Sequence, residues 1–290
     1  MSHNIKYKYP IIVIGMHRSG TSMLSRILEE IGIFMGDKKD INNEALFFLK
    51  FNEYIFKQAL ARWDDPENIK CTSDIFDQNI IRAYKKQANS FSVIKYLGFK
   101  RIIKYKGLNK MDFNWGWKDP RNSFTLNIWR QIYPDAKVIH IYRNPVDVAN
   151  SLRQRSIQEE QQIKKKIKKK LSEKFLKSSF YHDLFKIQSL DVGYKLWEQY
   201  LLKCLNHNDT FNLCYEDLLK NPQLELEKLI TFLGLDLDAN QLNKVSSTIK
   251  SDRRFAFLSS PELVKFYHDI KNNPVVRRLN YHRITDENTH

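Results

Sequence analysis

A short loop with two glycines, Gly15 to Ser22 (GMHRSGTS), is the first part of the chain whose residues could bind a reactive phosphate or sulfate group. It lies between a run of β-branched residues and a segment with helical spacing of apolar residues. In such a loop the backbone N–H groups and the dipole of the following helix can hold an anion. Nucleotide-hydrolysing loops of this shape carry lysine directly after the second glycine, where this chain has Thr21. Arg18 supplies the cation instead, which disfavours metal-dependent phosphoryl transfer.

A second candidate anion site is the segment VIHIYRNPVDVANSL, in which Arg143 ends an apolar run. Pro145 stands where the first turn of a helix tolerates proline, so a strand that leads into a helix is expected. Ser151 would lie about two helical turns along this helix. Arg143 and Ser151 can bind the same phosphate only if the junction between strand and helix folds back on itself.

Hydrophobic spacing predicts the elements that position these two segments. Strands are expected at residues 9–15, 115–117, 136–143 and 210–216, and helices at 23–32, 44–60, 74–96, 129–132 and 217–235. Strands that alternate with helices predict a parallel sheet with helices on both faces. We therefore expect an α/β fold, a single domain of residues 1–290 with a P-loop-like central parallel sheet and a helical cap at about 40–112.

The net charge of +15 would concentrate anionic ligands around the chain. Abundant Lys, Ile and Asn is also what a genome poor in G and C produces, so the charge alone does not select a partner. The run IKKKIKKKL lies in an expected Lys-rich helix at about 153–182. A solvated helix face is the usual state of such a run, so we expect its lysines to act on encounter with an acceptor or a surface and not on a nucleotide.

The cysteines and the N-terminal sequence indicate the cellular compartment in which the protein is expected. Cys71, Cys204 and Cys214 form no CxxC pair, and an odd number fits a reducing compartment better than a disulfide framework. MSHNIKYKYP has no apolar core of signal-peptide length, and the apolar stretch that follows is too short to span a bilayer. We expect a cytoplasmic protein without a transmembrane segment. The eight histidines show no HxxxH or HExxH spacing, so no metal site is expected.

Both candidate anion sites resemble motifs of the sulfotransferases that use 3′-phosphoadenosine-5′-phosphosulfate (PAPS). The family's donor loop, x-x-[RK]-S-G-[ST]-[ST], is matched by Arg18, Ser19, Gly20, Thr21 and Ser22. The family's 3′-phosphate segment, strand-R-[ND]-P-x-D-x-x-x-S, is matched with Arg143 and Ser151 at the phosphate-binding positions. The resemblance covers roughly residues 10–258. It implies a transferase that takes a sulfuryl group from PAPS, releases 3′,5′-ADP and needs no metal.

Further residues take roles from the same resemblance. Tyr215, in LCYED, matches the tyrosine that can contact adenine. WGWKDPR is similar to a segment of carbohydrate-type and tyrosyl-protein members whose lysine lies near the transferring group, here Lys118. Arg253 and Arg254 stand where the family often offers basic groups to the 3′-phosphate, although SDRRFAF lacks the RKGxxG pattern of cytosolic members.

Sulfuryl transfer to an alcohol also needs a base for the acceptor proton, and cations that face the transferring group. NNEALFFLKFN resembles the family's carboxylate-using pattern E-x₇-N, which makes Glu44 the expected catalytic base, with Arg18 and Lys118 as the cations. The alternative for Glu44 is a helix N-terminal carboxylate stabilised by the dipole. His17 and His140 are further candidates for the base, and His140 is expected to point into packed layers.

Two other functions remain open at this point: a P-loop kinase or NTPase, and a non-catalytic protein that binds polyanions. The missing lysine counts against the first, and the absence of an RNA-binding motif or of aromatic residues interleaved with basic ones counts against nucleic acid as partner. WKDPR favours a carbohydrate or glycolipid headgroup as acceptor. Protein tyrosine and small phenols stay open.

Overall fold

The computed structural model describes residues 9–170, 187–251 and 253–284. Contacts along the chain divide it into two units. The first unit comprises Met1–Tyr142 and Lys203–Ser251, and the second comprises Arg143–Leu202 and Asp252–His290.

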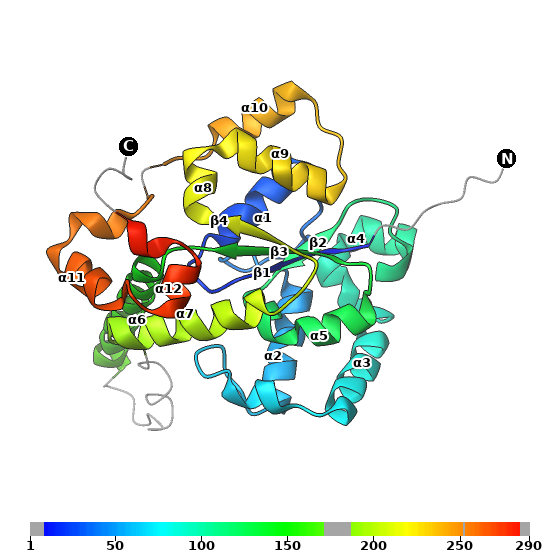
Figure 1. The fold of residues 1–290 in the computed structure, drawn as a ribbon. Helices are drawn as coiled ribbons and strands as arrows, with labels where there is room; N and C mark the ends of the chain where they lie inside the picture. The colour runs from blue at the N-terminus through cyan, green and yellow to red at the C-terminus, as the bar shows by residue number, and fades with distance from the viewer. Residues whose placement is uncertain (1–8, 171–186, 252, 285–290) are drawn as a thin grey trace. The chain divides into compact units, whose positions relative to one another are not determined.

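The first unit contains a four-stranded parallel sheet in the order β2-β1-β3-β4 (Figure 1). Its strands are β1 (Ile11–Ile14), β2 (Gly116–Lys118), β3 (Lys137–Tyr142) and β4 (Thr210–Cys214). Ile11 pairs with Gly116 on one side and with Lys137 on the other. Every residue of β1 is buried, as the continuous run of β-branched residues predicts for a parallel strand covered on both faces. The predicted α/β class with a central parallel sheet flanked by helices is confirmed.

Helices cover both faces of this sheet. Figure 1 shows α1, α8 and α9 on one face and α2, α3 and α5 on the other. The helices of the first unit are α1 (Thr21–Glu30), α2 (Leu46–Gln58), α3 (Asp74–Ala88), α4 (Ile94–Tyr105), α5 (Asn122–Ile132), α8 (Tyr215–Lys220), α9 (Pro222–Leu233) and α10 (Ala239–Ser247), with short 3₁₀ helices η1 (Glu67–Cys71), η2 (Phe91–Val93) and η3 (Leu108–Lys110). The expected cap between β1 and β2 is thus helical, built from α2, α3 and α4.

The two faces carry different cores. Aliphatic residues of α1 and α9, among them Leu24 and Leu229, pack against β1 and β3 on one face. On the other face, the ring of Phe48 in α2 stacks on Trp117 of β2, with ring centroids 3.9 Å apart. Trp129 of α5 lies against the same Trp117 ring, with centroids 4.9 Å apart. This aromatic core fixes α2 and α5 to the end of β2, where Lys118 stands.

The prediction of one helix from Asp74 to Tyr96 is wrong, because the segment divides after Ala88. Asn89 donates to the Lys85 carbonyl, and the hydroxyl of Ser90 donates to the Gln87 carbonyl. Short polar side chains of this kind compete for backbone groups and end helices. The chain then continues through η2 into α4.

The second unit is helical in its described residues. It contains α6 (Pro145–Lys170), most of α7 (Leu190–Leu205), η5 (Ala256–Ser259), α11 (Pro261–Ile270), α12 (Pro274–Arg278) and η6 (Tyr281–Arg283). The expected Lys-rich helix at about 153–182 coincides with α6 as far as Lys170, and residues 171–182 lie outside the described residues. In the part of the chain that the structure describes, no helix is both long and apolar enough to cross a membrane.

Candidate active site

The loop between β1 and α1 has the shape that its two glycines permit. A Cβ on Gly15 would lie 2.3 Å from the Ile141 carbonyl oxygen, and a Cβ on Gly20 would lie 2.5 Å from the ring of Tyr215. Both glycines also have positive φ, +138° and +94°, a region that favours glycine. The Gly15 N–H donates to the hydroxyl of Ser123 at 3.1 Å. The backbone of the loop is therefore held against β3, α5 and the start of α8.

The side chains of this loop divide into buried and exposed ones. Ser19 is 1% exposed, and its hydroxyl has no hydrogen-bond partner among the described residues. A buried hydroxyl without a partner is costly in an apo protein, and a ligand oxygen would relieve that cost. Thr21 is also buried, while Arg18 is exposed with a positive φ of 70°. The loop therefore fits an anionic group, with the Arg18 cation on its solvent side.

Lys118 and Glu44 form a buried ion pair beside this loop. Lys118 Nζ lies 3.1 Å from Glu44 Oε1, and the two residues are 1% and 3% exposed. Lys118 Nζ also donates to the Asn42 carbonyl at 2.6 Å and lies 3.5 Å from the hydroxyl of Ser22. The hydroxyl of Ser22 in turn donates to the same Asn42 carbonyl at 2.7 Å. The predicted base and the predicted cation thus meet at the start of α1, although 74 positions separate them in the chain.

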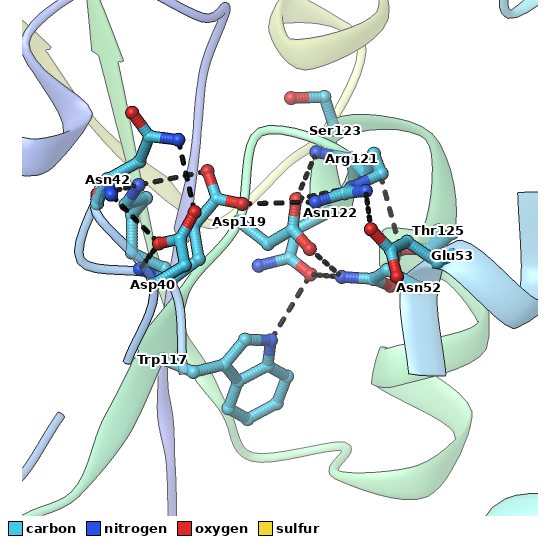
Figure 2. Close-up of polar contacts among 12 residues, drawn as sticks. Asp40, Asn42, Asn52, Glu53, Trp117, Asp119, Arg121, Asn122, Ser123 and Thr125 are labelled. Atoms are coloured by element: carbon cyan, nitrogen blue, oxygen red, sulfur yellow. Dashed lines mark hydrogen bonds and ion pairs between the residues drawn. The ribbon is translucent and has the colours of Figure 1, made fainter. Parts of the chain in front are cut away.

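Arg121 forms an ion pair with the second carboxylate oxygen of Glu44. Its Nη2 lies 3.0 Å from Glu44 Oε2, and its Nε lies 2.9 Å from Asp119 Oδ1. Asn52 Nδ2 donates to the other oxygen of Asp119 at 2.9 Å and to Asn122 Oδ1 at 2.8 Å (Figure 2). Every member of this network is buried, and a buried polar network in which partners are satisfied is rigid. It ties Glu44 to β2, α2 and α5.

A tight turn before α2 aims the Glu44 side chain inward. Asp40 Oδ1 accepts from the N–H groups of Asn42 and Glu44, at 2.9 and 2.7 Å. Asn43 has φ 62°, in the left-handed region that Asn tolerates better than most residues. The sequence D-I-N-N-E carries this turn, because a short Asp side chain can bond the backbone two to four residues on.

The surroundings of Glu44 favour a carboxyl that can exchange its proton near neutral pH. Burial raises the pKa of Glu44 to about 7, with a further contribution from the negative charge of Asp119. The positive charges of Lys118 and Arg121 act in the opposite direction and keep the pKa of Glu44 from rising further. A base with a pKa close to the working pH is the effective choice for general base catalysis.

The two histidines considered as alternative bases have other surroundings. His17 lies in the loop with its ring 4.6 Å from that of Trp63, centroid to centroid. His140 is 1% exposed in β3, its Nδ1 lies 2.8 Å from Asn212 Oδ1, and burial lowers its pKa to about 4.

In the second unit, Arg143 is buried and joined to the late segment that contains Arg253. Arg143 Nη2 lies 2.8 Å from Asp147 Oδ2 and donates to the Arg253 carbonyl at 3.0 Å. Asp147 Oδ1 accepts from the N–H of Phe257 at 2.9 Å. The structure thus brings Arg143 to residues 253–257, which sequence reasoning joined only through a family pattern.

The other predicted residues of this second group are placed as follows. The guanidinium of Arg254 lies over the ring of Phe255, 5.0 Å from its centroid, and the Arg253 side chain is exposed. Ser151 is half-buried on α6. In the first unit, Tyr215 is 6% exposed and belongs to the aliphatic core, with its ring against Gly20.

A family model described as "Sulfotransferase family" matches residues 10–239, which include the loop, Glu44, Lys118 and Arg143. The chain belongs to the sulfotransferase family. No curated protein matches it. The family assignment confirms the resemblance drawn from the loop and from the Arg143 segment.

Solved sulfotransferase structures are similar to the chain at low identity. A sulfotransferase from Alicyclobacillus acidocaldarius is 14% identical over 98% of this chain and 100% of its own, with a TM-score of 0.46. A mouse sulfotransferase complexed with PAP is 14% identical over 94% of this chain and 88% of its own, with a TM-score of 0.43. A sulfotransferase domain from the Synechococcus PCC 7002 olefin synthase is 16% identical over 90% of this chain and 84% of its own, with a TM-score of 0.43.

Sequence reasoning missed one charged residue in each unit that contacts a predicted site residue. Arg121, in WKDPR, and Asp147, in RNPVD, lay inside motifs that were used only for Lys118 and Arg143. Each stands three or four residues after a selected cation and contacts a selected residue in the structure. For Asp147 the signal was an opposite charge four positions after Arg143 at a predicted strand-to-helix junction. Arg121 carries the same charge as Lys118 and pairs with the distant Glu44, so no local signal pointed to it.

Proposed function

We propose that the chain transfers a sulfuryl group from PAPS to a hydroxyl or amine of a carbohydrate or glycolipid headgroup. The observation that carries the proposal is the buried pair of Glu44 and Lys118 at the edge of the anion-binding loop. A base and a cation are what transfer to a neutral acceptor requires. Both units would then act as one sulfotransferase domain of residues 1–290 in the cytoplasm.

In this proposal the donor is held at both of its ends. The 5′-phosphosulfate binds the loop, and the 3′-phosphate binds a set of basic and hydroxyl side chains, with Tyr215 beside adenine. The loop residues are Arg18, Ser19, Gly20, Thr21 and Ser22, and the 3′-phosphate residues are Arg143, Ser151, Arg253 and Arg254. The unpartnered hydroxyl of buried Ser19 supports the first part, and the contact of Arg143 with the Arg253 carbonyl supports the second.

Three buried side chains, those of Lys118, Glu44 and Arg121, would have different roles in the reaction. Lys118 and Glu44 neutralise each other in the structure, and a sulfuryl oxygen that competes for Lys118 Nζ would release Glu44 Oε1. Glu44 Oε1 then accepts the proton of the acceptor as the new bond to sulfur forms and the bond from sulfur to the 5′-phosphate oxygen breaks. Arg121 stays on Oε2 and keeps the carboxylate in place. The products are the sulfated acceptor and 3′,5′-ADP.

Activity should depend on pH through Glu44. Because the pKa of Glu44 is raised to about 7, we expect kcat/KM for the acceptor to fall as pH drops through about 7.

The same shift makes stability depend on pH. The pKa of Glu44 is higher in the folded state than in the unfolded state, so the folded state binds more protons between pH 4.5 and about 7. The contribution of Glu44 to stability should therefore decrease as pH rises across that window. Rate profiles and thermal melts at matched pH values measure both effects, and the Glu44→Gln variant should lose the stability slope. A rate profile flat from pH 6 to about 8 contradicts a titrating base at this position.

Arg143→Ala should weaken binding of 3′,5′-ADP at least about tenfold, because a charge-assisted bond to phosphate contributes roughly 1.5–3 kcal/mol. Affinity for 5′-AMP should not change, since it lacks the 3′-phosphate. Isothermal titration with both nucleotides measures the difference, and a melt of the apo variant reports the effect of leaving Asp147 without its ion pair.

Arg155→Ala is the matched control, because Arg155 lies on the same helix and pairs with Glu159 on a more exposed face. It should bind both nucleotides like the unchanged protein. Equal loss of 3′,5′-ADP and 5′-AMP affinity in Arg143→Ala would show that Arg143 does not bind the 3′-phosphate.

Titration with 3′,5′-ADP and with ATP, each with and without Mg²⁺, separates the proposal from its alternatives. A sulfotransferase should bind 3′,5′-ADP without metal. Tighter binding of ATP in the presence of Mg²⁺ would indicate a P-loop kinase or NTPase. If neither nucleotide binds, the result would favour a non-catalytic protein that binds polyanions. A screen of oligosaccharides and glycolipids with labelled PAPS then identifies the acceptor.

A further inference from the structure

The segment Phe91 to Lys110 combines exposed apolar side chains with positive charge. Its sequence, FSVIKYLGFKRIIKYKGLNK, contains six Lys or Arg residues and no Asp or Glu. Phe91, Phe99 and Ile103 are 82%, 69% and 60% exposed. An exposed phenylalanine or isoleucine on its own is ordinary. Several such residues in one uniformly basic segment need an explanation.

Helix geometry sorts these residues into two adjacent rows. Gly98 has φ 72° and ψ 169°, which interrupts α4 and starts a new helical turn at Phe99. Phe99 and Ile103 are four positions apart, and so are Lys100 and Lys104, so each pair lies on one side of the helix. All four side chains are exposed. The rows are neighbours, because consecutive helical residues are about 100° apart.

The opposite side of α4 already belongs to the core. Tyr96 and Leu97 are fully buried, and the Tyr96 hydroxyl donates to the Gly116 carbonyl of β2 at 2.6 Å. Arg101 lies over the ring of Phe34, 4.2 Å from its centroid. The exposed apolar pair is therefore not a displaced part of the core. It stands outward on a helix whose inner side is anchored.

The carboxylate of Asp37 lies against Gly98 at the start of this face, but the segment Phe91 to Lys110 itself carries six Lys or Arg residues and no Asp or Glu. Lys104 lies 3.9 Å from the half-exposed carboxylate of Asp112, a weak surface contact. Ile75, an exposed apolar residue on α3, has a different setting, because it stands between Asp74 and Asp77 at the start of that helix. Positive charge beside apolar side chains is what a helix that lies on an anionic membrane presents.

We propose that this face of α4, formed by Phe99, Lys100, Ile103 and Lys104, docks on the surface of an anionic lipid bilayer. Phe99 and Ile103 enter the boundary between headgroups and acyl chains, and the two lysines bind lipid phosphates. The contact is peripheral and reversible, because two apolar side chains and a short basic segment provide only a weak anchor. It does not depend on the transfer reaction.

Sedimentation with lipid vesicles tests the docking face. The full chain should bind vesicles with about 30% phosphatidylglycerol, bind pure phosphatidylcholine weakly, and lose binding as salt is raised to about 0.5 M. Phe99→Ser with Ile103→Ser, and separately Lys100→Ser with Lys104→Ser, should each lower the bound fraction at least about fivefold. Thermal melts should show that both double variants fold.

Two control variants carry matched changes outside the face. Ile75→Ser removes an equally exposed apolar residue from α3, and Lys85→Ser with Lys86→Ser removes two exposed lysines from the same helix. Both should bind vesicles like the unchanged chain. The proposal is overturned if the unchanged chain does not bind anionic vesicles, or if Phe99→Ser with Ile103→Ser binds as well as the control. It is equally overturned if only changes in the lysines at 164–170 matter, since the membrane contact would then lie on α6.

Discussion

Glu44→Gln should lower turnover by about 10²–10⁴, the range for loss of one positioned proton acceptor, while donor affinity barely changes. Glutamine keeps the shape of the side chain and can still accept from Lys118, but it cannot take a proton. Its amide also places a donor opposite Arg121 Nη2, which now lies 3.0 Å from a carboxylate oxygen. We therefore expect a lower melting temperature together with the loss of turnover, and both must be measured on the same sample.

Glu53→Gln is the matched control for this variant. Glu53 Oε1 also contacts Arg121, at 3.3 Å, but its side chain is 56% exposed. Its change should leave turnover within about threefold, because an exposed ion pair contributes little. If Glu44→Gln kept near-normal turnover per folded molecule and lost only stability, Glu44 would be a structural carboxylate and His17 the next candidate for the base.

The strands and the donor loop could be predicted because their signals are local. Ile11 to Ile14 form a continuous apolar run, as a strand buried on both faces requires, and Gly15 and Gly20 mark a loop that needs positive φ. Motif resemblance also selected Glu44 and Lys118, each from its own segment. Their 3.1 Å contact could not be predicted from spacing, because it depends on the pairing of β1 with β2 and on the turn at Asn42, whose carbonyl accepts from both Ser22 and Lys118.

The groups that escaped prediction act through other residues. Asp40 orders the turn before Glu44 through two backbone N–H groups, and Arg121 bridges Glu44 and Asp119. A sequence motif identifies residues that are expected to contact a ligand, whereas Asp40 and Arg121 contact other residues of the protein. The break after Ala88 was missed for a related reason, since Ser90 ends the helix through side-chain bonds that compete with helical spacing.

Lys118→Met should lower turnover by about 10³ or more. Loss of one group that stabilises developing charge usually costs 10²–10³, about 2.7–4 kcal/mol. Lys118 also lowers the pKa of Glu44, so its removal should leave Glu44 protonated at neutral pH and unable to act as base. Lys137→Met is the control, because Lys137 stands at the opposite end of the sheet and donates to the Phe232 carbonyl at 2.7 Å.

Combining Lys118→Met with Glu44→Gln separates the ion pair's structural role from its catalytic one. In Lys118→Met alone, ionised Glu44 would be buried with Arg121 as its remaining cation, and breaking a buried pair costs about 3–5 kcal/mol. Protonation of Glu44 relieves this cost at low pH, so the stability of the single variant should fall as pH rises from about 4.5 and should continue to fall above about 7, where the contribution of Glu44 in the unchanged protein levels off. The double variant has no charge to bury at either position. It should therefore regain stability at pH 8 relative to Lys118→Met and remain as inactive, measured by thermal melts and by transfer from labelled PAPS. A double variant that regained turnover with its stability would mean that neither side chain takes part in the chemistry, and that the pair serves only to hold the start of α2 against β2.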